Sequence, residues 1–292
     1  MANLPPQERL RRFGAKNVLI RNLLAELFGT FTLCFVGLSI VVQFHIGRTK
    51  FTNWLGVNIG WGFAILFSVQ STLRISGGHL NPAVSLLMWS FGHIKFTWFI
   101  LYSIAQTIGA FIAAAATYFY YIDSFDHYDK GIRSVLGPTG TGSCFCSYPQ
   151  EYLGVLSPYI DQIVGTGALA FFLCVVIDER NGIPKVWHPT FFSFLLIMIG
   201  CAFGMNLGYP INPARDFGPR LFSYFIYGSG VFSSPYNMYF LAPIIGPFIG
   251  ALLGGWLYFL TIGMQNPPVE GVRNTDIPYI DQDGELRKPL TA

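Results

Sequence analysis

Charged side chains are scarce in this chain. Only 11% of its 292 residues are Asp, Glu, Lys or Arg, whereas 52% are hydrophobic and 17% aromatic. About a quarter of the residues in a soluble domain are charged, so this composition excludes an ordinary soluble fold and indicates a protein of the lipid bilayer. The 32 glycines and 18 prolines agree with this interpretation, because both residues are common in membrane helices.

Several other patterns are missing from the sequence. The five cysteines have no metal-ligand spacing, and no set of His, Ser and carboxylate residues forms a catalytic pattern. The net charge of +3 gives no nucleic-acid signal, and the first 20 residues lack the apolar core of a cleavable signal peptide. We therefore expect no catalytic residues, no metal, no cofactor and no nucleic-acid partner.

Apolar runs long enough to cross a bilayer as helices occur six times. They cover about 22–44, 54–73, 97–121, 162–177, 189–208 and 238–262. Twelve of the 18 basic residues lie in the two tails and in the second and fourth connections, which predicts that both termini are cytoplasmic. The sequence thus predicts an integral membrane protein with a tail over 1–20, a six-span domain over 21–262 and a second tail over 263–292.

Two connections, 78–91 and 208–226, are apolar enough to enter the membrane but too short to cross it, so they are expected to be re-entrant loops. They belong to a repeat, because Glu26 to Thr30 (ELFGT) is echoed by Gln162 to Thr166 (QIVGT), and each loop contains Asn-Pro-Ala. Repeat one covers about 21–121 and repeat two about 160–262. Three spans per repeat force the second repeat to insert upside down, and inverted repeats place the site near the midplane.

The two Asn-Pro-Ala motifs, Asn81-Pro82-Ala83 and Asn212-Pro213-Ala214, are typical helix starts. Asn caps free backbone N–H groups, and Pro suits the first helical position. Because one loop enters from each face, we expect the two helix N-termini to oppose each other, with amide donors free at the centre. Positive helix ends disfavour cations and protons there, so the centre suits neutral, hydroxylated solutes.

These motifs resemble those of the major intrinsic protein family. Residues 78–84 (GHLNPAV) and 212–220 (NPARDFGPR) look like its aquaglyceroporin branch. The resemblance implies an all-α, right-handed bundle of six transmembrane helices plus two re-entrant half-helices. It also implies a passive channel for glycerol and water, with urea as a further candidate permeant, that excludes protons and ions. The resemblance further implies a homotetramer, and we expect the protein to lie in the plasma membrane.

The resemblance also implies a selectivity filter formed by Trp61, Gly200, Tyr209 and Arg215. Arg215 itself is unusual, since a cation just after a helix cap opposes the dipole and is costly in a membrane. Water-selective members have His where Gly200 stands, so glycine is expected to widen the pore. The bacterial glycerol facilitator has Phe where Tyr209 stands, which leaves the balance of water and glycerol open.

Backbone carbonyls before each half-helix should form an acceptor ladder along the pore. On the inner side these are Gly77, Gly78 and His79, and on the outer side Asn206, Leu207, Gly208 and Tyr209.

Structural support is expected from three side chains. Glu26 and its repeat partner Gln162 should brace the loops by accepting their N–H groups, and Asp216 suits a helix N-terminus. The charged run from Asp178 to Arg180 is interpreted as a solvated loop.

Two other functions stay open. A water-selective aquaporin is disfavoured by Gly200 and Asp216. An ion-coupled secondary transporter also uses inverted repeats and broken helices, but it needs ionisable residues at the midplane, where this sequence predicts two neutral asparagines.

Overall fold

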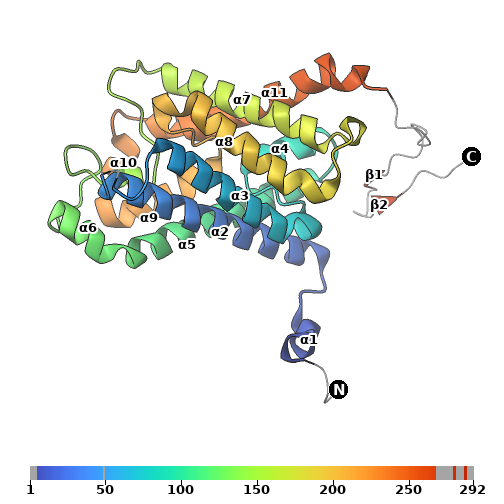
Figure 1. The fold of residues 1–292 in the computed structure, drawn as a ribbon, viewed down its shortest axis with the longest axis horizontal. Helices are drawn as coiled ribbons and strands as arrows, with labels where there is room; N and C mark the ends of the chain where they lie inside the picture. Colours follow the sequence, from blue (N-terminus) through green and yellow to red (C-terminus); the bar gives the residue numbers. More distant parts are fainter. Residues whose placement is uncertain (1–4, 49, 268–278, 281–285, 288–292) are drawn as a thin grey trace, which may run out of the picture.

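Long α-helices lie side by side along one axis of the computed structural model, which describes residues 5–48, 50–267, 279–280 and 286–287 (Figure 1). Six helices in these ranges have 20 residues or more. They are α2 (Val18–Ile46), α3 (Trp54–Ser76), α5 (Phe96–Tyr120), α7 (Ser157–Ile177), α8 (His188–Leu207) and α11 (Ala242–Thr261). Each coincides with a span predicted from the sequence, although α2 and α7 begin earlier than the predicted starts at about 22 and 162.

Shorter elements lie between and beyond these helices. The α-helical ones are α1 (Pro6–Leu10), α4 (Pro82–Ser90), α6 (Ile122–Asp129), α9 (Pro213–Tyr227) and α10 (Gly230–Ser233). The 3₁₀ turns are Arg11–Phe13, Gly142–Cys144, Glu179–Asn181, Lys185–Trp187, Tyr239–Leu241 and Gly263–Gln265. Strands β1 (Tyr279–Ile280) and β2 (Leu286–Arg287) pair antiparallel. The rest of the predicted C-terminal tail, 268–278, 281–285 and 288–292, lies outside the described residues.

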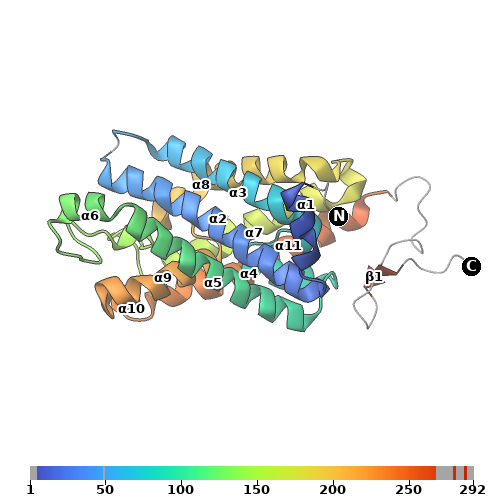
Figure 2. The same ribbon diagram turned by 90° about the horizontal axis from the view of Figure 1, so that it is seen from below.

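The bundle has two distinct ends. We call the end from which α1 and the segment after α11 emerge the terminal end, and the opposite end, which carries α6 and α10, the distal end (Figure 2). In the part of the chain that the structure describes, α2, α5, α7, α8 and α11 are both long and apolar enough to span a membrane. The sixth helix, α3, has 23 residues and so rises about 34 Å, which is sufficient to cross. It is more polar because Asn58, Ser68 and Thr72 lie on its buried side.

The helix contacts repeat between the two halves of the chain. In the first half α2 packs on α3 and α5, and in the second half α7 packs on α8 and α11. The half-helix α4 packs on α5 and α11, and α9 packs on α11 and α5. The halves also meet where α3 contacts α8. This exchange of partners is the arrangement that an inverted repeat produces, and it brings α4 and α9 together inside the bundle.

Glycines allow the closest helix contacts. A Cβ on Gly254 of α11 would collide with the backbone of Gly167 on α7, and one on Gly109 of α5 would collide with the Leu27 carbonyl of α2. Small residues at such crossings are typical of membrane bundles, because close packing replaces the missing hydrophobic force between helices in lipid. The helix pairs α2 with α5 and α7 with α11 are equivalent in the two repeats, and the counterpart of the Gly109 contact is that of Gly250 on α11 with the Ile163 carbonyl of α7.

Candidate functional site

The two re-entrant loops, 77–81 and 208–212, have the same backbone path. Three positions before each Asn have positive φ: Gly77 (91°), Gly78 (62°) and Leu80 (51°) in the first loop, and Gly208 (76°), Tyr209 (45°) and Ile211 (36°) in the second. Residues other than glycine rarely adopt this left-handed backbone conformation, because their Cβ comes too close to the following carbonyl oxygen. The repeat in the sequence therefore extends to the backbone conformation, including two strained positions directly before the Asn residues.

Each Asn caps its half-helix. The Asn81 side-chain oxygen accepts from the Ala83 N–H at 2.9 Å. The Asn212 oxygen accepts from the N–H groups of Ala214 and Arg215, at 3.0 and 3.2 Å. Pro82 and Pro213 occupy the first helical positions. The half-helices α4 and α9 thus begin at the residues that the sequence predicts.

The two Asn amides also tie the loops together. The Asn81 Nδ2 donates to the Ile211 carbonyl at 3.0 Å, and the Asn212 Nδ2 donates to the Leu80 carbonyl at 2.8 Å. One N–H of each amide is therefore used between the loops, which corrects the expectation that both remain free. The second N–H of each amide is left to donate to a solute.

Glu26 of α2 lies under the first loop and is fully buried. Its two carboxylate oxygens accept from the backbone N–H groups of His79 (3.0 Å) and Leu80 (2.7 Å). They also accept from the Ser76 hydroxyl and from the Gln106 amide. Four donors surround this one side chain, which compensates for burying a carboxylate at membrane depth.

Gln162 of α7 occupies the equivalent place under the second loop. Its oxygen accepts from the Ile211 N–H at 2.9 Å, and its amide donates to Asp161 at 3.0 Å. The second loop thus receives one backbone hydrogen bond from its brace, whereas the first loop receives two.

Arg215 follows the Asn212 cap on α9. Its guanidinium carbon lies 5.0 Å from the centre of the Trp61 ring, and it donates to the Phe145 carbonyl at 3.3 Å. A cation over an indole face is electrostatically favourable, the more so where water is excluded. The ring and the carbonyl therefore fix the position of a cation that the membrane would otherwise disfavour.

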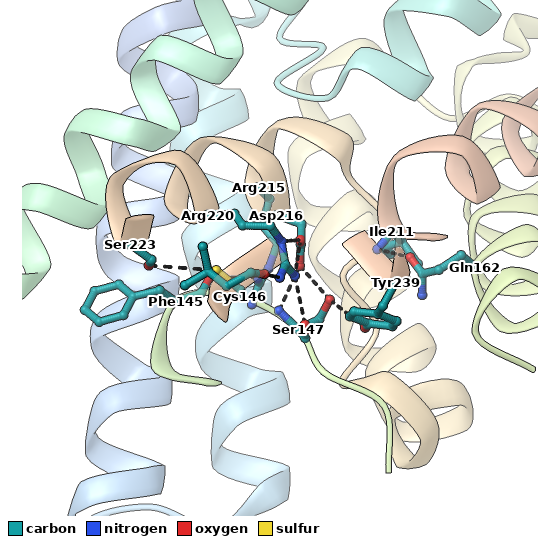
Figure 3. A network of polar contacts seen from close by, with 11 residues as sticks. Phe145, Cys146, Ser147, Gln162, Ile211, Arg215, Asp216, Arg220, Ser223 and Tyr239 are labelled. Carbon is teal, nitrogen blue, oxygen red and sulfur yellow. Dashed lines mark hydrogen bonds and ion pairs between the residues drawn. The ribbon is translucent and has the colours of Figure 1, made fainter. Parts of the chain in front are cut away.

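Asp216 and Arg220 form a buried ion pair on the same helix, and both side chains are 0% exposed (Figure 3). The other Asp216 oxygen accepts from the Ser147 N–H at 2.8 Å, and Arg220 also donates to the carbonyls of Ser147 and Val231. This network anchors α9 to the segment 145–147, whose Phe145 carbonyl holds Arg215. Sequence reasoning missed the pair, although an Asp and an Arg four residues apart in a helix are a recognisable signal.

Tyr209 packs against three residues on two helices. Its hydroxyl donates to the Asn58 Oδ1 at 2.7 Å. Its ring packs edge-on against the Trp54 ring, with the two ring centroids 5.9 Å apart. A Cβ on Gly200 would lie 2.7 Å from Tyr209 Cζ and 2.5 Å from Asn58 Oδ1. The space that the missing Cβ of Gly200 leaves is therefore occupied by Tyr209 and Asn58. Glycine at this position makes space for the Tyr209 ring and does not widen the pore directly.

The carbonyl positions agree with the sequence in part. Gly77, Gly78 and His79 are non-helical and line a cavity, as do Gly208 and Tyr209. Asn206 and Leu207 were predicted as pore carbonyls, but both belong to α8, and the Asn206 carbonyl accepts from the Gln150 N–H at 3.1 Å. The outer non-helical stretch instead runs over 208–212, because α8 stays helical to Leu207, close to the end of the apolar run predicted over 189–208.

A cavity of about 1690 Å³ joins these groups. It begins at Arg180 and Asn266 at the terminal end and reaches Trp61, Tyr209 and Arg215, with both Asn81 and Asn212 on its wall. In the described ranges, no group of three or more His, Cys, Asp and Glu side chains is placed to hold a metal ion.

Asp178 lies at the mouth of the cavity, in the run that the sequence analysis interpreted as a solvated loop. Asp178 pairs with Arg180 and also accepts from the Tyr258 hydroxyl (2.8 Å) and the Asn266 amide (3.2 Å). Burial alone would raise the pKa of Asp178, but the hydrogen bonds from Arg180 and Tyr258 outweigh it and hold that pKa below its ordinary value. The charged run is thus a structured rim that links α7, α11 and the segment leading into the C-terminal tail.

Comparison with known proteins places this geometry in a family. The sequence model of the major intrinsic proteins matches residues 14–258. Aquaporin-9 of Mus musculus is 36% identical over 265 residues, which cover 89% of this chain and 90% of the mouse protein. Aquaporin-10 of Homo sapiens is 35% identical over 290 residues, with coverages of 98% and 96%. Aquaglyceroporin-3 of Trypanosoma brucei brucei is 38% identical over 239 residues, with coverages of 82% and 77%.

The fold agrees as well. The crystal structure of the aquaglyceroporin from Plasmodium falciparum matches this structure with a TM-score of 0.76 and 27% sequence identity, over 84% of this chain and 97% of that one. The chain therefore has the aquaporin fold, in which six helices and two re-entrant half-helices form an inverted repeat. The family consists of passive channels, so the chain is a membrane channel and not an enzyme. It belongs to the major intrinsic protein family.

Proposed function

We propose that this channel conducts glycerol, water and other small uncharged solutes, urea among them, and excludes protons and ions. The observation that carries the proposal is the cavity, which runs past Asn81 and Asn212 and reaches Trp61, Tyr209 and Arg215. A solute on this path meets mostly apolar side chains and a few polar groups. This pattern suits a molecule with a carbon backbone and hydroxyl groups.

The polar groups on this path select by hydrogen bonding. Each Asn keeps one N–H for a solute oxygen, and Arg215 offers further donors. Matching every solute hydroxyl matters, because an unpaired buried hydroxyl costs about 1–3 kcal/mol.

Ion exclusion in this proposal rests on charge. The N-termini of α4 and α9 carry partial positive charge, and both point toward the Asn pair. Arg215 adds a full positive charge beside them. A cation or hydrated proton would lose its water there without gaining a compensating anion, since the Glu26 carboxylate is already surrounded by four donors.

We also propose the setting of the channel. The terminal end faces the cytoplasm, as the distribution of basic residues suggests, and the membrane is the plasma membrane. Residues 21–262 form the channel domain between two cytoplasmic tails. Four copies assemble with one pore each, and chemical cross-linking in native membranes, read as the size of the largest product, tests this number.

The test of conduction uses purified protein in lipid vesicles, with water and glycerol permeabilities measured by stopped-flow light scattering. We expect glycerol entry well above that of empty vesicles, with no proton current as read by a pH-sensitive dye. Gly200→His should reduce glycerol more than water, because the new side chain displaces Tyr209 toward the cavity. Met205→His, on an exposed position of the same helix, is the control. Glycerol entry equal to that of empty vesicles would contradict the proposal.

A further inference from the structure

Asn58 is a buried polar residue in the outer half of the channel to which the proposed function gives no role. It lies on α3, one helical turn before Trp61, and its side chain is 0% exposed. A buried amide in a membrane helix is costly unless it is hydrogen-bonded, so its partners indicate why it is there.

Both ends of the Asn58 amide have a partner. The oxygen accepts from the Tyr209 hydroxyl at 2.7 Å, a distance typical of a strong O–H···O bond. The nitrogen donates to the Cys201 sulfur at 3.5 Å, which is a weak acceptor. The strong interaction of Asn58 is therefore with the aromatic residue that lines the cavity.

Tyr209 itself needs such support. Its φ of 45° is in the left-handed region, where a bulky residue is strained. The ring fits only because Gly200 has no Cβ. Its backbone conformation, the missing Cβ and the hydrogen bond to Asn58 together hold the ring in one position, with its single O–H donor directed away from the solute.

We infer that Asn58 is a specificity-determining positioning residue, which withdraws the Tyr209 hydroxyl from the pore so that the ring presents an apolar wall opposite Arg215. This inference rests on the proposed function. With Asn58 in place, Tyr209 acts toward solutes as a phenylalanine would. Without it, the hydroxyl loses its acceptor and turns to the pore, where it hydrogen-bonds water and narrows the apolar path for the carbon backbone of glycerol.

The experiment compares Asn58→Leu, Tyr209→Phe and the double variant by stopped-flow measurement, with the ratio of glycerol to water permeability as the readout. Asn58→Leu should lower the ratio roughly three- to tenfold, the size expected for loss of one hydrogen bond. Tyr209→Phe should leave it within about twofold, and adding Asn58→Leu to Tyr209→Phe should change it little further, because the hydroxyl is already gone. Cys201→Ala, which removes the weaker partner, should keep the unmodified ratio.

The outcomes separate this inference from the proposed function. If the unmodified protein passes glycerol but Asn58→Leu keeps its ratio, or lowers it equally with Tyr or Phe at 209, the role assigned to Asn58 is wrong and the channel assignment stands. If the unmodified protein passes no glycerol, the proposed function is wrong, and the inference fails with it. If Asn58→Leu does not fold, the double variant decides: a folded, glycerol-permeable double variant supports the pairing, and a misfolded one contradicts it.

Discussion

The two re-entrant loops share one backbone path but are held in different ways. Loop 77–81 is supported from beneath by the Glu26 carboxylate, which accepts two backbone N–H groups and two side-chain donors. Loop 208–212 receives one backbone bond from the neutral Gln162. Its half-helix is anchored from the distal side instead, by the Asp216–Arg220 pair and segment 145–147.

The difference shows where an inverted repeat can diverge. Both loops must present an Asn at the centre, so the caps and the two ties between the loops are nearly identical. The first loop then needs only to be rigid, whereas the second must also position Tyr209 and Arg215. In the first repeat the buried charge, Glu26, lies beneath the loop. In the second repeat the buried charges, Asp216 and Arg220, lie on α9, the half-helix that follows the loop, and the predicted filter lies on that side.

The strongest test of this comparison removes the two braces. Glu26→Ala leaves two backbone donors buried without acceptors, at about 1–3 kcal/mol each, so we expect a loss of roughly 2–6 kcal/mol of stability. Gln162→Ala leaves only one, so its loss should be about half as large. Thermal unfolding of the purified variants in detergent measures both. Equal losses would show that the two loops depend on their braces to the same extent.

A second test addresses the anchor of α9. Arg220→Met leaves the Asp216 charge buried and unpaired, which should cost about 3–5 kcal/mol. Asp216→Leu combined with Arg220→Met should recover much of this loss, because no buried charge remains. Lys185→Met is the control, since its pair with Glu179 is largely exposed and should contribute less than about 1 kcal/mol. A double variant no more stable than Arg220→Met would mean that the anchor acts through the bonds to segment 145–147 rather than through the charge.

The sequence predicts those features that local chemistry determines. Asn81 and Asn212 could be placed because Asn-Pro is a helix start whatever surrounds it, and the repeat then set the two starts against each other. The places of the long helices followed from apolar length, although α2 and α7 begin before their apolar runs. The end of α8 shows the limit of this reasoning, because Asn206 and Leu207 were predicted as pore carbonyls although both fall within the apolar run over 189–208, and the structure places them in α8.

Features that depend on tertiary contact could not be predicted in this way. Asn58 and Tyr209 are 151 positions apart, and nothing local to Asn58 indicates a partner on another helix. Gly200 suggested free space, but only packing shows that the Tyr209 ring fills it. The rim around Asp178 likewise depends on Tyr258 and Asn266 being brought back to the same end of the bundle.

The smallest expected effect compares two left-handed glycines, Gly78 in the first loop and Gly208 in the second. An added Cβ at Gly208 would meet only Trp54 at 4.0 Å, so Gly208→Ala should cost just the backbone strain of about 1–2 kcal/mol. At Gly78 the Cβ would lie 3.0 Å from Thr72 Oγ1 and 3.2 Å from Val69 Cγ1, so Gly78→Ala should cost more, by up to about 1–3 kcal/mol of overpacking. Shifts in the midpoint of thermal unfolding measure the two variants side by side.

The position equivalent to Gly78 in the second loop is Tyr209, which is why this small difference is informative. The first loop has no space for a side chain at that position, whereas the second has space made by Gly200 and a hydrogen-bond acceptor supplied by Asn58. If Gly78→Ala costs no more than Gly208→Ala, the first loop also has room for a side chain, and packing does not explain why the filter aromatic lies on one side only. If the costs differ as expected, steric crowding in the first loop helps to confine that aromatic to the second loop.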